Sequence, residues 1–165
     1  MRFSVFVMFG LTCAACTGAE AEEPVRRAAE FRSDVVEVGL DADSELIRAR
    51  GFADQSENAW RGFLVDGGAA VDQARFRSGN CYVVLAAASA GIQAMRLAVY
   101  DSDGAEVARS EDPRRALRYC PPQTGTYFVA VRATGSGLFA VRRFEGPTGL
   151  DIVLDDLRGP GEPAP

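Results

Sequence analysis

From residue 61 onward, short runs of alternating apolar and polar residues dominate the chain. In the segment 95–100 (MRLAVY) every second residue is a large apolar one, and the segment 127–133 (YFVAVRA) repeats this pattern. A period of two places successive side chains on opposite faces of a strand, so these runs predict half-buried β-strands. The run Cys81–Ala88 is apolar almost throughout, which predicts a central strand buried on both faces.

Turn residues separate these runs. Asp66-Gly67-Gly68 predicts a hairpin turn, and Asp101-Ser102-Asp103-Gly104 predicts a second one. Short strands about ten residues apart, with no helical pattern between them, predict an all-β fold, an antiparallel β-sandwich. The eight expected strands are 62–65, 71–77, 81–88, 95–100, 106–109, 117–120, 127–133 and 138–144.

The first sixteen residues, MRFSVFVMFGLTCAAC, are typical of an export signal. Arg2 precedes an apolar run, 3–11, that is far shorter than the about 20 residues needed to span a bilayer. The small residues before Cys16 resemble a lipobox, which implies that Cys16 becomes the acylated first residue of a lipoprotein; Cys13 stands where a leucine is usual. The alternative is ordinary cleavage after the A-x-A-like site 19–21.

The sequence therefore predicts an exported protein of the cell envelope, held on a membrane through Cys16. We favour the outer membrane; the periplasm or secretion is the alternative. The chain divides into a signal peptide (1–15), an acylated cysteine and flexible tether (16–24), an N-terminal lead-in (25–60), the β-sandwich (61–146), a short C-terminal segment (147–158) and a disordered tail (159–165).

Two stretches outside the sandwich have ambiguous patterns. Pro24 and the residues after it favour a short helix, whereas Val35–Val38 reads equally well as a strand. Leu150–Leu157 has the length of one or two helical turns packed on an end of the sandwich.

Composition narrows the function. The formal net charge is −5, and an acidic balance disfavours nucleic acid as a partner because binding there depends on neutralising phosphates. The chain contains no histidine and no lysine, which excludes Ser-His-Asp and Cys-His catalysis and Schiff-base chemistry within it. Cys81 and Cys120 remain after the leader, and we expect them to form a disulfide in an oxidising compartment.

The order GNCYVVLAAA, LAVYDSDGAEVARS, YCPPQTGTYFVAV, GLFAV resembles the bacterial pre-peptidase C-terminal domain over roughly residues 60–145. The shared features are the buried strand 81–88, the strand that ends in an Asp-x-x-Gly hairpin at 97–104, and the valine-rich strand 125–131. The resemblance implies a jelly-roll-like sandwich that serves as an accessory module. Many members carry an acidic residue where this chain has Gln93-Ala94-Met95, which argues against the calcium site that this residue is sometimes implicated in.

The remaining candidates for chemistry are acidic. Carboxylate pairs perform glycoside hydrolysis when they face each other across a cleft, but we interpret Glu111-Asp112 and Asp155-Asp156 as solvated surface. We interpret Asp101 and Asp103 as turn residues rather than calcium ligands, because a calcium loop needs more oxygen ligands and a distal glutamate.

Arginines and one tryptophan complete the candidates. Arg114-Arg115 with Arg118, and Arg142-Arg143, form small basic clusters, which we interpret as polar strand faces rather than sites for anionic lipid or polysaccharide. Trp60 is interpreted as an anchor at the core edge rather than a sugar platform.

We therefore expect no catalytic residue, metal ligand or cofactor. The predicted function is a non-catalytic β-sandwich binding module on a membrane surface, whose partner is an envelope protein or a polysaccharide. The alternative is a carboxylate-dependent envelope enzyme, such as a glycoside hydrolase or a subunit of one.

Overall fold

The computed structural model describes residues 36, 40–56, 59–110, 115–154 and 157. Within them, strands form two antiparallel sheets that pack face to face, which confirms the predicted all-β sandwich. The strands are β1 (Ala53–Asp54), β2 (Trp60–Leu64), β3 (Ala69–Phe76), β4 (Asn80–Ala88), β5 (Ile92–Tyr100), β6 (Glu106–Arg109), β7 (Ala116–Tyr119), β8 (Gly125–Gly135) and β9 (Gly137–Pro147).

The two sheets divide the strands unevenly. Sheet A has the order β9-β4-β7, with β1 and β2 both paired to the other edge of β9, and sheet B has the order β3-β8-β5-β6. The chain crosses from one sheet to the other at most connections between the described strands. Among these strands, only β5 and β6 are consecutive and paired as a hairpin. The two-residue strand β1 was not predicted from the sequence.

The predicted hairpin at Asp66-Gly67-Gly68 is wrong. A turn is present, with Gly68 N–H donating to Val65 O at 2.8 Å, but it joins β2 of sheet A to β3 of sheet B. The reason lies in the core: Leu64 of β2 and Phe76 of β3 both bury their side chains between the sheets, which requires the two strands to face each other rather than lie side by side.

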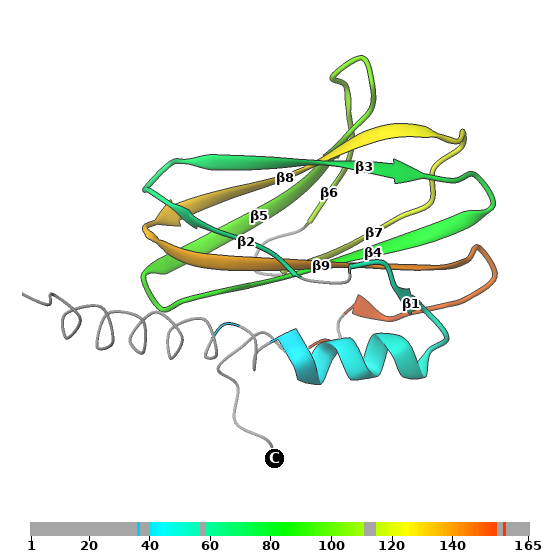
Figure 1. Cartoon of the computed structure of the whole chain (residues 1–165), viewed down its shortest axis with the longest axis horizontal. Helices are drawn as coiled ribbons and strands as arrows, with labels where there is room; N and C mark the ends of the chain where they lie inside the picture. Colours follow the sequence, from blue (N-terminus) through cyan, green and yellow to red (C-terminus); the bar gives the residue numbers. More distant parts are fainter. Residues whose placement is uncertain (1–35, 37–39, 57–58, 111–114, 155–156, 158–165) are drawn as a thin grey trace, which may run out of the picture.

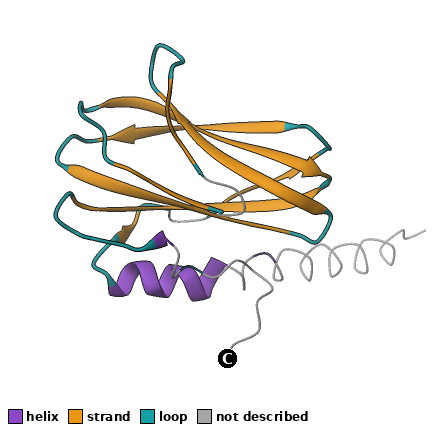
Figure 2. Ribbon diagram, turned by 180° about the vertical axis from the view of Figure 1, so that it is seen from behind, coloured by secondary structure: helices purple, strands orange, loops and turns teal. Residues whose placement is uncertain are grey.

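Sheet A is the middle of three layers, because a helix covers its second face (Figures 1 and 2). One apolar core fills the space between the sheets, and a second fills the space between sheet A and the helix. Strand β4 serves both: Tyr82 and Val84 face the first core, and Cys81 and Val83 face the second. The predicted burial of this strand on both faces is therefore confirmed.

The helix at 40–49 lies within the predicted lead-in segment, and the sequence pattern did not reveal it. Leu40 and Ile47 are fully buried against sheet A, at the i, i+7 spacing of one helix face. Ser44 lies between them and is also buried; its Oγ donates to Leu40 O at 2.5 Å. The helix predicted after Pro24 falls outside the described residues except for Val36, which is helical.

The C-terminal segment also packs on sheet A. Leu150 and Leu154 contact the second core, where Ile152 is buried. This segment lies on a sheet face rather than on an end of the sandwich, and 155–156 fall outside the described residues. Among the described residues, no helix has the length and apolar character to cross a membrane.

The expected disulfide is present. Cys81 of β4 bonds Cys120, the residue directly after β7. The register places Tyr82 opposite Tyr119, so the two cysteines are brought together by the pairing of β4 with β7.

Candidate binding surface

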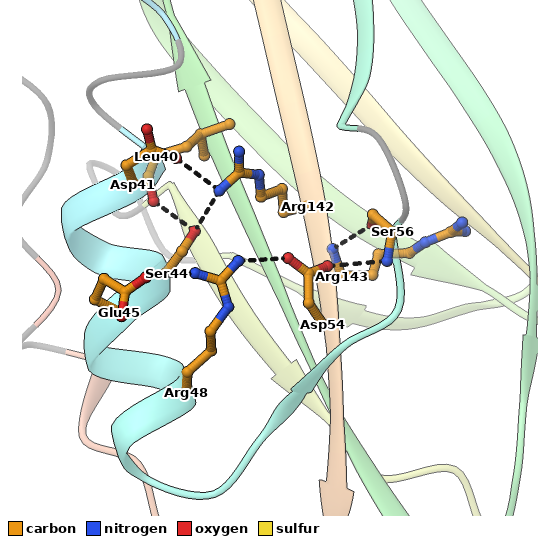
Figure 3. A network of polar contacts seen from close by, with 9 residues as sticks. All are labelled: Leu40, Asp41, Ser44, Glu45, Arg48, Asp54, Ser56, Arg142 and Arg143. Carbon is orange, nitrogen blue, oxygen red and sulfur yellow. Dashed lines mark hydrogen bonds and ion pairs between the residues drawn. The ribbon is translucent and has the colours of Figure 1, made fainter.

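Arg142 and Arg143 are neighbours in the sequence but do not form a basic cluster. Successive side chains of a strand point to opposite faces, and β9 sends these two in opposite directions (Figure 3). Arg142 pairs with Asp41 at 2.8 Å and donates to Ser44 Oγ at 3.2 Å, both on the helix. Arg143 pairs with Asp72 of β3 at 2.9 Å. Both arginines therefore hold layers of the fold together.

We expect Arg142→Met to lower the free energy of unfolding by about 1 kcal/mol, since the change removes one part-exposed ion pair and one hydrogen bond. Hydrogen exchange should show faster exchange of the helix amides, while the amides of sheet B keep their protection. Arg143→Met is the matched control, and it should loosen the edge strand β3 instead. Equal effects of both variants on the helix would contradict the separate roles of the two side chains.

A third arginine, Arg48, lies on the helix and strengthens the contact between the helix and sheet A. Arg48 pairs with Glu45 at 2.7 Å and with Asp54 of β1 at 2.9 Å, and its guanidinium lies 5.9 Å from the ring centroid of Phe144. The hydrogen bond with Asp54 raises the pKa of Arg48 above its ordinary value. Figure 3 shows Arg48 and Arg142 reaching between the helix and the sheet.

The other predicted arginine cluster is also divided. Arg118 of β7 donates to Leu150 O at 2.8 Å and lies 3.7 Å from Asp151, so it holds the C-terminal segment on sheet A. Burial lowers the pKa of the Arg115 guanidinium. Arg114 falls outside the described residues. The described members of the cluster lie within the fold rather than on a basic surface patch.

In the β5–β6 turn, the Asp101 carboxylate accepts hydrogen bonds from backbone N–H groups of the turn. Asp101 Oδ1 accepts from Asp103 N–H at 3.0 Å and from Ala105 N–H at 2.9 Å. Gly104 takes the positive φ of 83° that closes such a turn. Within the described part of the chain, no cluster of three acidic or cysteine residues is placed to hold a metal ion.

Trp60 lies at the edge of the core between the sheets. Its ring is half-buried and meets Phe139 edge to face, with 5.2 Å between the ring centroids. The packing against Phe139 therefore accounts for a tryptophan at this position, as the prediction of a core-edge anchor expected.

Other described carboxylates also have structural partners. Glu145 of β9 accepts from the Tyr82 hydroxyl at 2.8 Å and from Asn80 Nδ2. Burial raises the pKa of that tyrosine. Asp66 accepts from Gly135 N–H at 2.6 Å and so ties two loops together. The predicted surface pairs Glu111-Asp112 and Asp155-Asp156, like Cys16, fall outside the described residues.

The outer face of sheet B has no layer packed on it in either view of the described chain, in contrast to sheet A (Figures 1 and 2). We define this face by the outward side chains of its four strands in the order in which they pair. They form three rows: Gln73, Phe128, Tyr100 and Glu106; then Val71, Ala130, Ala98 and Arg109; then Ala69, Arg132 and Arg96.

The middle row is apolar from Val71 to Ala98 and ends at Arg109, and it is partly open. Val71 is 59% exposed, whereas Ala98 is buried although it lies on the outer face. Phe128 and Tyr100 beside this row are half-buried. Val71 is diagonal to Phe128 across β3 and β8, and Phe128 is opposite Tyr100 on β5. The apolar side chains therefore gather on one part of the face rather than being scattered singly.

Arginines lie at one end and along one side of the apolar residues. Arg96 and Arg132 are direct cross-strand neighbours, both are exposed, and neither makes an ion pair among the described residues. Arg109 pairs with Glu106 at 2.5 Å, and Glu106 also accepts from the Tyr100 hydroxyl. The three rows thus hold one carboxylate, which is already partnered, and an excess of arginine on an otherwise acidic chain.

Comparisons with known proteins assign the chain to no family. The crystal structure of Aeromonas hydrophila PliG, a periplasmic lysozyme inhibitor of g-type lysozyme, is similar at 11% sequence identity, with a TM-score of 0.47 over 59% of this chain and 90% of that chain. No protein-family model matches the chain, and no curated protein is similar to it in sequence. Likeness at this level carries no argument about what the chain binds.

Proposed function

We propose that the protein is a non-catalytic binding module of the cell envelope that presents the outer face of sheet B to a partner. The observation that carries this proposal is the exposed Val71 together with the half-buried Ala130, Phe128 and Tyr100. Arg96 and Arg132, which make no ion pair with another described residue, border them. The charged residues described above also support a non-catalytic role. Arg142 and Arg143 hold layers of the fold together, and Asp101 holds a turn.

The proposal includes export and anchoring. The leader and the lipobox-like residues before Cys16 support acylation. Several acyl chains give a stable anchor, because each buried CH₂ contributes about 0.8 kcal/mol. The resemblance to the pre-peptidase C-terminal domain supports an accessory role, and the outer membrane remains the favoured location.

The anchor is tested by metabolic labelling with a clickable fatty acid. We expect the wild type to be labelled and to sediment with membranes, and Cys16→Ala to be unlabelled and released. Gln93→Ala, at an exposed position of β5, serves as the expression control. Equal labelling of wild type and Cys16→Ala would contradict acylation at Cys16.

The enzyme alternative is tested with the purified protein and a panel of chromogenic glycosides. The binding-module proposal predicts no turnover above buffer. Turnover that disappears on a single Asp→Asn or Glu→Gln substitution, such as Glu145→Gln, would overturn the proposal.

A further inference from the structure

We propose that the outer face of sheet B binds an acidic surface of a partner protein, with carboxylates seated at Arg96 and Arg132. This inference rests on the proposed function, because it names the partner of the same face. It is drawn from the charges and the apolar pattern that the strand register brings together.

The arginine pair indicates the charge of the partner. Like charges directly opposite each other on neighbouring strands are destabilising, and Arg96 and Arg132 occupy such positions. Arg109 lies on the same face, and Arg75 extends it along β3 beyond Gln73. The guanidinium group binds carboxylates in a bidentate manner. Carboxylates of a partner would therefore reduce the repulsion between Arg96 and Arg132 and accept hydrogen bonds from their guanidinium N–H groups.

The apolar row indicates that the partner is a protein. Ala98 and Ala130 are short side chains between the aromatic pair Phe128 and Tyr100 on one side and the two arginines on the other. Contact of an apolar partner side chain with this row removes Val71 from water. Aromatic residues and arginine are enriched in protein interfaces, while lysine and glutamate are depleted there. A polyanionic glycan or a lipid headgroup would use the arginines and leave the apolar row in water.

The Arg96–Arg132 pair also allows the effect of a substitution on partner binding to be distinguished from its effect on stability. Arg96→Glu turns the repulsive pair into a cross-strand ion pair with Arg132. This variant should therefore melt at a higher temperature than the wild type and yet bind an acidic partner more weakly. A variant that merely unfolds cannot produce this combination.

The experiment measures binding of the purified protein to defined probes at low salt. The first probe is a peptide of three Glu-Leu-Glu-Ser repeats, and its control is the same peptide with glutamine in place of glutamate. The competing probes are polygalacturonate and phosphatidylglycerol vesicles. We expect the acidic peptide to bind best, Arg96→Glu to weaken it at least tenfold with a raised Tm, and Arg77→Glu, at the exposed β3–β4 turn, to change the affinity less than twofold.

Three results would overturn the inference: equal or no binding of the two peptides, unchanged binding by Arg96→Glu, or tighter binding of polygalacturonate or vesicles. The last result leaves a binding module with another ligand, whereas glycoside turnover lost in Glu145→Gln removes the proposed function itself. The two failures are therefore distinguishable.

Discussion

Replacing Phe144 with alanine is expected to lower the free energy of unfolding by about 3–5 kcal/mol. Phe144 lies on β9 and is fully buried in the core between sheet A and the helix, together with Leu40 and Ile47. Its removal takes away a large apolar surface and also the ring beneath the guanidinium of Arg48. The packed layers on both sides prevent the cavity from collapsing, so the loss should lie in the upper part of the range.

Urea denaturation followed by circular dichroism measures this effect, and hydrogen exchange locates it. We expect the helix 40–49 to exchange fastest in Phe144→Ala, before the strands of sheet B. Phe63→Ala is the matched control, because Phe63 is also in sheet A but is 62% exposed; it should change stability by no more than about 0.5 kcal/mol. A comparable loss in both variants would contradict the second core as the source of the stability.

Breaking the disulfide between Cys81 and Cys120 is expected to cost about 4 kcal/mol. The bonded cysteines are 39 positions apart in the sequence, and the chain-entropy model gives that magnitude for a loop of this length. Cys120 is exposed, whereas Cys81 is fully buried. Cys120→Ala therefore removes the bond while leaving the core filled, and Cys81→Ala adds the loss of packed sulfur to it.

The measurement is the urea midpoint with and without reductant. Reductant should lower the midpoint of the wild type to that of Cys120→Ala and leave this variant unchanged, while Cys81→Ala should fall below both. A wild-type midpoint that does not respond to full reduction of the bond would refute this contribution. Such a bond persists in an oxidising compartment, in agreement with the proposed location.

The sequence predicted local structure well, because period-two patterns report which side of a strand is buried. The segment 95–100 and the run Cys81–Ala88 both formed strands. The run Cys81–Ala88 is buried on both faces as expected, whereas 95–100 departs from strict alternation at Ala98, which is buried on the outer face. The connection at Asp66-Gly67-Gly68 was wrong since turn residues specify a reversal of the chain but not the sheet in which the next strand lies. The helix 40–49 was missed because buried polar residues, Asp43 and Ser44, interrupt its apolar stripe.

The candidate surface was harder to foresee than the fold. Arg142 and Arg143 look like a cluster in the sequence, yet alternation on β9 sends them to opposite faces. Arg96 and Arg132 are 36 positions apart in the numbering (132 − 96) and meet only through the pairing of β5 with β8. A surface made by cross-strand register has no signature along the chain, so pattern reading alone cannot locate it.

The position of β9 has a consequence for how the chain reaches its folded state. β9 is the last of the described strands, and it pairs with β1, β2 and β4. Its residue Phe144 also lies in the core between sheet A and the helix. In a growing chain, β1 and β2 therefore have no strand partner until β9 has been made. Folding dominated by such distant pairings is slow, and the two earliest strands join sheet A only once β9 is in place.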